Sequence, residues 1–497
     1  MQSTQRVTLY AAILGSAVVF MDGTIVNVAL PAIRDDLGSS LAAQQWIVEA
    51  YLLTLGALLL VGGSLGDRLG RRRVFMAGLM GFGATSALCA IAPSDVLLIA
   101  ARALQGAAGC LLVPSSLALI TATFSSEERG AAIGSWTAWT GIAFVVGPLG
   151  GGALIEFVSW RWVFAINVPV VIVTLMLARR IPESRDEEIE GRIDYLGAVL
   201  ASLGLAGPVF ALIEQPHYGW GSPIVFVPLI AGLALLVAFV WHEEHTPHPM
   251  LPLNLFRSRN FAIGNLATLM IYGGLGAATF FVTIFLQQVA GFTAIAAGLS
   301  LVPLTIIMWL LSRRWGALSE RIGPRLLMGF GPIVAGLGLI WMGRLRADVD
   351  YVTDLLPGIL VFGLGLSATV APLTNTVLGS VPQHHAGVAS GVNNQVSRVA
   401  ALLAIAVLGA VVAGVFSSQP GVGDAEPLSG GSPAVTDASV KAYRTGLGVG
   451  GGLVMLGGVI SLAGIVNPPK RAAPRAPVQE LGAIRLAHPC PEPRQAA

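Results

Sequence analysis

Gly62-Gly-Ser-Leu-Gly-Asp-Arg-Leu-Gly-Arg-Arg-Arg73 lies between two long apolar segments, at 46–60 and 74–92. Its glycines, Gly63 and Gly70 among them, permit backbone angles and close helix approaches that a Cβ atom would forbid. Asp67 is suited to the positive N-terminus of a neighbouring helix, and the arginines favour the cytoplasmic side of a membrane. The stretch therefore predicts a short, rigid turn between two transmembrane helices. A positively charged loop without a further role is the simpler alternative.

A degraded copy of this stretch occurs in the second half of the chain. At 316–325, 253 residues further on, Glu320-Arg321 stands where the first copy has Asp67-Arg68. Two other pairs of segments repeat at offsets of 257 and 258 residues: 129–134 with 386–391, and 113–115 with 371–373. Three pairs of similar segments at nearly the same offset predict that the chain consists of two homologous halves.

The composition is that of a polytopic membrane protein. Of the 497 residues, 54% are hydrophobic and 11% are charged, against roughly 25% charged residues in soluble domains. About fourteen apolar stretches are long enough for a membrane-spanning helix, which needs roughly 20 residues. The net charge of +2 does not indicate a nucleic-acid partner. Neither the three cysteines nor His-Glu-Glu-His at 242–245 has metal-site spacing, so no metal is expected.

The basic residues predict the topology. Twenty-two arginines and lysines, Arg398 among them, fall at the helix ends and loops on one side of the membrane, and six fall on the other side. The richer face is cytoplasmic by the positive-inside rule, so both termini are predicted to be cytoplasmic. Arginine greatly outnumbers lysine, which is compatible with a GC-rich bacterium, and a bacterial plasma membrane is the expected location.

Four segments are expected. Residues 1–182 form a bundle of six helices, and 183–259 form a linker with two extra transmembrane helices. Residues 260–467 form the second bundle of six helices, and 468–497 form a proline-rich cytoplasmic tail that does not fold alone. The fold class is therefore an all-α polytopic membrane protein with two pseudo-symmetric bundles plus two inserted helices.

Few ionisable residues fall inside the predicted helices. Asp22 lies about 22 Å into the first helix, at 1.5 Å per residue, and Arg102 enters the fourth helix from the outer side. An isolated charge at such depth costs at least about 2.5 kcal/mol, so the two are predicted to face the interior and to pair. Glu49, near the outer start of the second helix, is a candidate third member. A purely structural ion pair is the alternative.

Several segments resemble those of the major facilitator superfamily. Gly63-Ser-Leu-Gly-Asp-Arg-Leu-Gly-Arg-Arg-Arg73 resembles its loop signature. Met21-Asp-Gly-Thr-Ile-Val-Asn27 resembles the first-helix signature of its fourteen-helix drug:proton antiporters, and Ala101-Arg-Ala-Leu-Gln105 is similar to a fourth-helix motif associated with proton coupling. Gly147-Pro-Leu-Gly-Gly-Gly152 resembles the fifth-helix antiporter motif.

The resemblance implies roles for particular residues. Asp22, Glu49 and Arg102 would couple transport to protons as the coupling ion, and no cofactor is expected. A cytoplasmic gate would contain Gly63, Asp67, Arg68, Gly70, Arg71, Arg72, Glu127, Glu128 and Arg129. Gly147, Pro148, Gly151 and Gly152 would form the antiporter motif, although close helix packing is the ordinary use of such glycines.

The predicted function is export of drugs, antibiotics or other amphipathic organic compounds by a monomer in the lipid bilayer. Candidate substrate residues are Asn27, Asn265, Tyr272, Phe280, Phe281, Asn375 and Asn393, although asparagines in membranes also join helices. One rival is a proton symporter that imports a metabolite or siderophore-like compound. A membrane sensor or enzyme is a second rival, but no catalytic constellation is recognisable in a helix interior.

Overall fold

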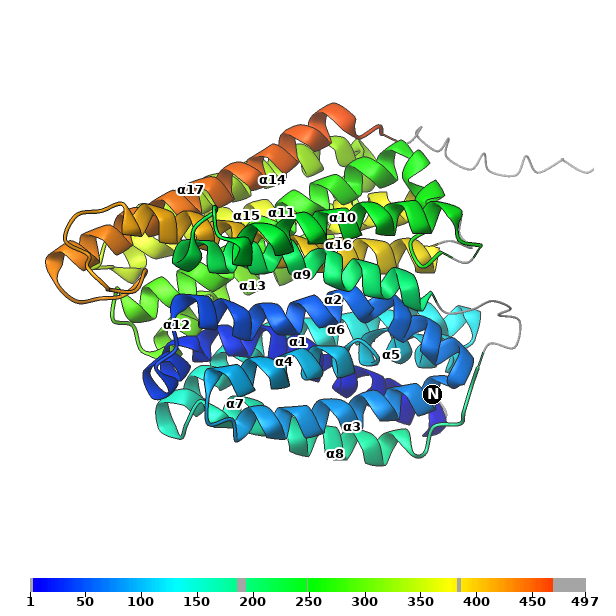
Figure 1. Cartoon of the computed structure of the whole chain (residues 1–497). Helices are drawn as coiled ribbons and strands as arrows, with labels where there is room; N and C mark the ends of the chain where they lie inside the picture. The colour runs from blue at the N-terminus through cyan, green and yellow to red at the C-terminus, as the bar shows by residue number, and fades with distance from the viewer. Residues whose placement is uncertain (1–2, 186–193, 248, 382–385, 468–497) are drawn as a thin grey trace, which may run out of the picture. The chain divides into compact units, whose positions relative to one another are not determined.

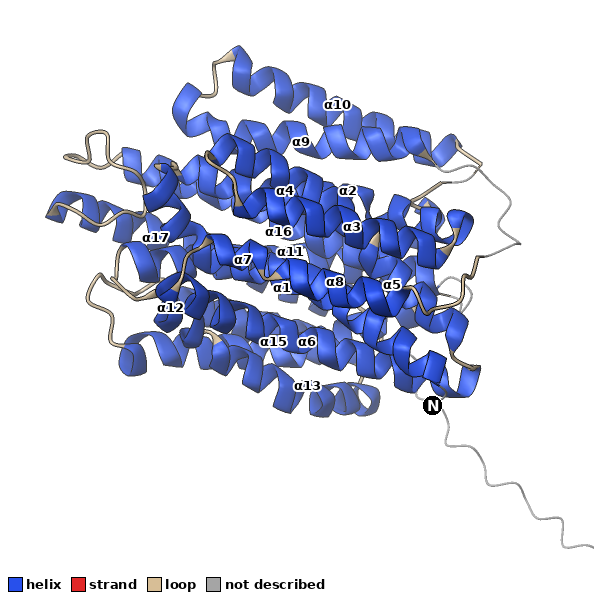
Figure 2. Ribbon diagram, turned by 90° about the horizontal axis from the view of Figure 1, so that it is seen from below, coloured by secondary structure: helices blue, strands red, loops and turns tan. Residues whose placement is uncertain are grey.

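The computed structural model describes residues 3–185, 194–247, 249–381 and 386–467, and within these ranges it is helical without strands (Figure 2). The first helices are α1 (Ser3–Leu37), α2 (Leu41–Leu69), α3 (Arg71–Ala90), α4 (Asp95–Gly109), α5 (Leu112–Thr123), α6 (Ser126–Phe157), α7 (Arg161–Ala165) and α8 (Asn167–Ala178). Two helices follow, α9 (Tyr195–Tyr218) and α10 (Pro223–His245). The last are η1 (Leu253–Arg257), α11 (Arg259–Gln288), α12 (Ala294–Ser300), α13 (Val302–Ile322), α14 (Pro324–Met342), η2 (Tyr351–Leu355), α15 (Leu356–Gly379), α16 (Ala386–Ser417) and α17 (Pro433–Gly464).

Each of the fourteen apolar stretches expected from the sequence is helical. Among the described residues, twelve helical segments are long and apolar enough to cross a membrane. The other two stretches correspond to α2 and α6, which at 29 and 32 residues also have sufficient length. The chain is a multi-pass membrane protein.

Three of the predicted spans are broken by prolines. Pro114, Pro169 and Pro303 each lie in the first turn of the second piece, in α5, α8 and α13. Proline has no amide hydrogen and cannot bond to the carbonyl four residues earlier, so the helix bends there. The carbonyl group of Cys110, which precedes Pro114 by four residues, instead packs against Gly62 of α2.

Two groups of helices pack mainly among themselves. We call α1–α8 the first bundle, in which α1 contacts α5, α6 and α8, and α3 contacts α4 and α8. The second bundle is α11–α17, in which α14 lies between α15 and α17, and α11 contacts α16 and α17. Figure 1 shows the first bundle in blue and cyan beside the second in green to red. The bundles meet where α2 contacts α16, α6 contacts α12, and α1 contacts α11.

The α9–α10 hairpin covers one edge of this junction. α9 packs against both α2 and α16, and Figure 2 shows the hairpin beyond α2 and α4. The indole Nε1 of Trp46 in α2 donates to Glu214 of α9 at 2.9 Å. At the other end of the hairpin, His242 bonds to Asp194 at 2.8 Å, so this histidine is engaged by a carboxylate within the hairpin.

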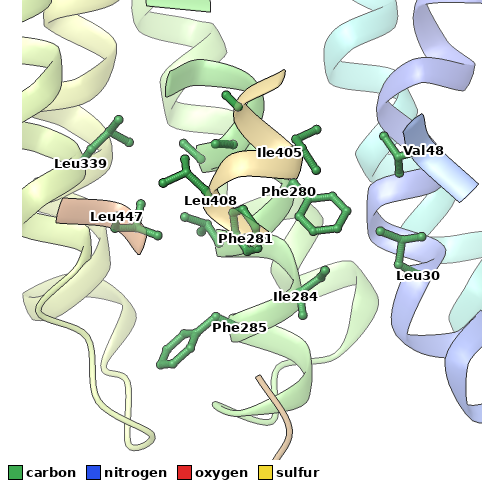
Figure 3. Close-up of a cluster of buried hydrophobic side chains, with 14 of the residues drawn as sticks. Leu30, Val48, Phe280, Phe281, Ile284, Phe285, Leu339, Ile405, Leu408 and Leu447 are labelled. Atoms are coloured by element: carbon green, nitrogen blue, oxygen red, sulfur yellow. The ribbon is translucent and has the colours of Figure 1, made fainter. Parts of the chain in front are cut away.

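We name the two ends of the helical body after the residues at the ends of α1, as the Ser3 end and the Leu37 end. The N-terminus and the end of α17 are both at the Ser3 end, on opposite sides of the helical body (Figure 1). The opposite, Leu37 end holds an apolar cluster that spans both bundles. Figure 3 shows Leu30 of α1 and Val48 of α2 facing Phe280 of α11, with Ile405 of α16 beside them. This cluster excludes water from the junction at the Leu37 end.

Candidate functional site

The charged centre of the first bundle is an ion pair between α1 and α4. The guanidinium of Arg102 donates to the carboxylate of Asp22, and the two side chains are 1% and 0% exposed. The pairing predicted from their similar depth is therefore present. The low-dielectric surroundings make each charge costly without the other, so the pair locks α1 to α4.

Neutral polar side chains complete the coordination of this pair. Gln105, one turn after Arg102, accepts from Arg102 at 2.6 Å and donates to Asp22 at 3.0 Å and to Ser86 at 2.8 Å. Asn167, at the start of α8, donates to Asp22 at 3.1 Å. Asp22 thus accepts from three donors on two other helices, α4 and α8, and Ser86 links the network to α3.

Arg102 has further partners that fix its position. Its Nε donates to the carbonyl oxygen of Ile47 at 3.0 Å, and its guanidinium carbon lies 4.1 Å from the centre of the Tyr51 ring, a cation–π contact. The hydroxyl of Tyr51 in turn donates to the carbonyl oxygen of Val19 at 3.0 Å. These contacts connect the ion pair to α2.

Glu49 is not part of this network. Its side chain is fully buried in α2, and neither carboxylate oxygen has a hydrogen-bond partner among the described residues. The expectation that Glu49 joins Asp22 and Arg102 is therefore not met in this structure. The reason is geometric: the α2 groups that reach Arg102 are the Ile47 carbonyl and the Tyr51 ring.

The glycine-rich turn has the predicted form. Gly70 ends α2 and begins α3 with φ +107°, and Gly323 joins α13 to α14 with φ +89°. Both backbones are in a region that favours glycine, which fits the repeat inferred from the sequence. Gly63 lies close to Pro114, with 3.5 Å between the position of a Cβ and the proline side chain.

The basic residues after Gly70 bind a segment that follows α8. Glu183 accepts from the backbone amide of Arg72 at 2.9 Å and lies 3.7 Å from the side-chain nitrogens of Arg72 and Arg73. The backbone amide of Arg71 donates to Ser184 at 2.8 Å. Glu183 was not among the residues selected from the sequence, because an acid in a mixed-charge loop carries no distinguishing pattern.

The remaining gate residues are placed only in part. The side chains of Asp67, Glu127 and Arg129 lie outside the described residues. Arg68 is half-buried near the end of α2. Glu128 accepts a hydrogen bond from Gln5 at 2.7 Å. The proposed latch between Arg71 or Asp67 and these groups therefore stays a prediction.

The glycines of the predicted antiporter motif bring α6 against both bundles. Gly147 faces Thr24 of α1, with 2.6 Å between the position of a Cβ and the threonine oxygen, and Gly151 faces Ile25. On the opposite face, a Cβ at Gly152 would lie 2.9 Å from the carbonyl oxygen of Ala294 at the start of α12. Pro148 lies inside α6, and its carbonyl group packs against Gly298. Close packing is thus one use of the motif.

Hydrogen bonds join the bundles at the Leu37 end. Arg34 donates to Gln288 at 2.6 Å, and Gln288 donates to Gln44 at 3.2 Å. Gln287 donates to the carbonyl oxygen of Val28 at 3.1 Å, and Gln45 to that of Ile405 at 3.0 Å. The Leu37 end is therefore closed in this structure.

Most of the candidate substrate residues are engaged in packing. Asn393 of α16 donates to Asn265 of α11 at 3.1 Å, so these two amides join helices. Phe280 and Phe281 are buried against one another, with 4.9 Å between ring centres. Tyr272 packs at the margin of the same apolar core, and Asn375 is exposed. Asn27 differs, because its amide oxygen is buried without a hydrogen-bond partner in the described part of the chain.

The structure corrects the position of one arginine. Arg398 was counted with the loops of the cytoplasmic face, but it lies twelve residues after Ala386, the start of α16, about 18 Å along the helix. The apolar stretch in this region is centred on 406, and four polar residues at 393–397 masked the earlier start of the helix. Gln105 was quoted only as the end of a motif, and neither Gln105 nor Asn167 was selected as a site residue, because a single amide in an apolar helix carries no distinguishing pattern.

The comparisons with known proteins agree with this architecture. The Major Facilitator Superfamily model matches residues 12–405. The puromycin resistance protein pur8 of Streptomyces alboniger is 34% identical, over 91% of this chain and 90% of its own. The tetracenomycin C resistance and export protein of Streptomyces glaucescens is 36% identical, over 82% and 76%. The multidrug resistance protein Stp of Mycobacterium tuberculosis is 33% identical, over 84% and 78%.

Solved structures of more distant proteins share the fold. A bacterial homologue of the lysosomal transporter Spinster, in an inward-facing and unoccupied conformation, has a TM-score of 0.68 and 16% identity, with 93% of this chain and 97% of that chain covered. The peptide transporter PepTSo has a TM-score of 0.67 and 15% identity, with 93% and 98% covered. The sequence matches and the shared fold together place this chain in the major facilitator superfamily.

Proposed function

We propose that this protein is a proton-coupled antiporter that exports amphipathic organic compounds, among them antibiotics or other drugs, by alternating access. The observation that carries the proposal is the buried Asp22–Arg102 pair. A proton on Asp22 removes one charge of the pair, so the lock between α1 and α4 weakens and the first bundle can reorganise. Relatives named as resistance, export and multidrug proteins support the direction of transport.

The orientation follows from the distribution of charge. The Ser3 end carries the arginines of the turn at Gly70, and the positive-inside rule makes this end cytoplasmic. In this proposal the closed Leu37 end faces outward and is the outer gate. An inward proton gains about 2.3 kcal/mol per 100 mV of membrane potential, which is sufficient to maintain a substantial gradient of the exported compound.

The site favours organic molecules over sugars. An extensive cluster of buried aromatic and aliphatic side chains spans the junction between the bundles. Small molecules with a large apolar surface gain most from such surroundings. We further propose that the transporter acts as a monomer in the plasma membrane of a bacterium, since each bundle is complete within one chain.

The proposal is tested in everted membrane vesicles with an imposed proton gradient and a panel of fluorescent amphipathic dyes of both charges. Antiport predicts accumulation of at least one dye that depends on the gradient, together with dye-induced proton release from the vesicles. Dye leaving the vesicles together with protons would instead identify a symporter. Correctly inserted protein that moves neither protons nor any dye would contradict proton-coupled export of amphipathic compounds.

A further inference from the structure

Arg398 is a permanent charge at the junction of the two bundles. Its guanidinium carbon lies 5.7 Å from the centre of the Phe20 ring in α1. Its Cβ lies 3.7 Å from the position that a Cβ would occupy at Gly56 in α2. The residue thus reaches from α16 of the second bundle to two helices of the first.

No described residue neutralises this charge. Arg398 has no hydrogen bond or ion pair with another residue in the described ranges, and its Nε is shielded from solvent without a partner. The residue has intermediate exposure, and its two terminal guanidinium nitrogens, unlike Nε, are not among the solvent-shielded atoms that lack a partner. A guanidinium does not release its proton in proteins, and an uncompensated charge within a membrane is costly. An anion from outside the chain would relieve that cost.

The nearby acids are not available to Arg398 in this structure. Asp22 is already occupied by Arg102, Gln105 and Asn167. Glu49 is on α2, seven residues from Gly56, which is about 10 Å along the helix towards the Leu37 end.

A second unpartnered polar group accompanies Arg398. Gln395 precedes it by three residues, so both side chains lie on the same face of α16. The amide oxygen of Gln395 is buried and has no hydrogen-bond partner among the described residues. The guanidinium of Arg398 can donate to the oxygens of an anion, and the amide oxygen of Gln395, one turn away, can accept a hydrogen bond from an N–H or O–H group of the same ligand.

We propose that Arg398 and Gln395 form an anion-recognition site at the junction of α1, α2 and α16, and that the exported compounds include amphipathic carboxylates or other organic anions. The ring of Phe20 provides an apolar surface beside the charge. An organic anion that leaves a cell with a negative interior also moves with the electric field. This inference rests on the proposed export function for its biological direction, but the binding itself does not depend on proton coupling.

The test uses purified full-length protein in detergent and two dyes with the same xanthene ring system. Fluorescein is anionic at mildly alkaline pH, and rhodamine 6G is cationic. Fluorescence anisotropy is expected to show tighter binding of fluorescein to the wild type. Arg398→Gln should weaken that binding by about tenfold or more, as expected when a charge-assisted hydrogen-bond donor is lost, and should leave rhodamine 6G unaffected. Arg398→Lys should restore part of the affinity, and Gln395→Leu should lower it less than Arg398→Gln.

The matched control is Arg346→Gln, which removes an exposed arginine from the loop before η2. It should leave both affinities unchanged. The proposal is overturned if the wild type shows no preference for the anion, if neither dye binds, or if Arg398→Gln and Arg346→Gln behave alike. It is also overturned if Glu49→Gln strengthens anion binding only when Arg398 is present, because the partner of Arg398 is then Glu49. Anion binding without gradient-driven transport would leave this site in place and contradict the proposed antiport.

Discussion

The carboxylate of Asp22 and the guanidinium of Arg102 form an ion pair that is shielded from solvent, and two amides, from Gln105 and Asn167, also donate to the same carboxylate. The carboxylate therefore has a dense set of donors for a membrane interior. Any proton that binds Asp22 must displace part of this network. That requirement is what makes the pair suitable for coupling protonation to helix movement.

Replacing Asp22 tests the coupling directly. In Asp22→Asn the amide can retain bonds to neighbouring side chains, but it neither balances the charge of Arg102 nor carries a proton. Removing one partner of a buried ion pair costs about 3–5 kcal/mol, so the variant should unfold at a lower temperature and should lose proton-driven dye transport. The measurement is transport in everted vesicles, normalised to the amount of folded protein. Asp36→Asn, which affects an exposed pair with Arg161, should retain transport; equal transport by the two variants would exclude Asp22 as the coupling residue.

Replacing Gln105 is predicted to reduce stability and transport nearly as much as replacing Asp22. Gln105→Leu removes its bonds to Arg102, Asp22 and Ser86 and leaves buried donors and acceptors unpaired, at about 1–3 kcal/mol for each unsatisfied group. Thermal unfolding in detergent should report a clear loss of stability, and transport should fall. Gln419→Leu, in the loop between α16 and α17, provides the control and should change neither. An unchanged melting temperature for Gln105→Leu would mean that water replaces the lost bonds.

The sequence contained much of the fold, because each apolar stretch had the length that the bilayer demands. The pairing of Asp22 with Arg102 followed from helix depth alone. The partners of Glu49 could not be predicted in the same way, since depth does not specify the direction in which a side chain points. Arg398 was misplaced because a run of polar residues hid the first turns of α16, and only the packing of α16 against Gly56 and Phe20 revealed that it lies at the bundle junction.

The turn between α2 and α3 should not tolerate a side chain at Gly70. In Gly70→Ala the alanine backbone would be held in a sparsely populated conformation, at about 1–3 kcal/mol, and its methyl group would lie 2.8 Å from the carboxyl carbon of Glu183. Gly38→Ala also has a positive φ, of +68°, but there the methyl group meets nothing within 4 Å. The melting temperature should therefore fall further for Gly70→Ala than for Gly38→Ala. Equal effects would show that the contact with Glu183 yields without cost.

The close approach of α6 and α12 should hold the Leu37 end shut. In Gly152→Ala the new methyl group would lie 2.8 Å from the Cα of Ile295 and 2.9 Å from the carbonyl oxygen of Ala294, so the two bundles must separate there. The same substitution at Gly150 meets nothing within 4 Å and is the matched control. A reporter cysteine replaces Leu41, which is 4% exposed beside the closed end.

A maleimide that cannot cross membranes should label this cysteine faster in the Gly152→Ala background than in the Gly150→Ala background, because opening of the Leu37 end exposes the thiol. The native cysteines in the described residues, Cys89 and Cys110, are buried. Labelling of the same protein with Leu41 retained is subtracted to correct for any reaction elsewhere. Transport by Gly152→Ala should decline, since a protein held open at one end completes fewer cycles. Equal labelling rates in the two backgrounds would show that the glycine face of α6 does not control closure, and the hydrogen bonds of Arg34 and Gln288 would then be the group to test.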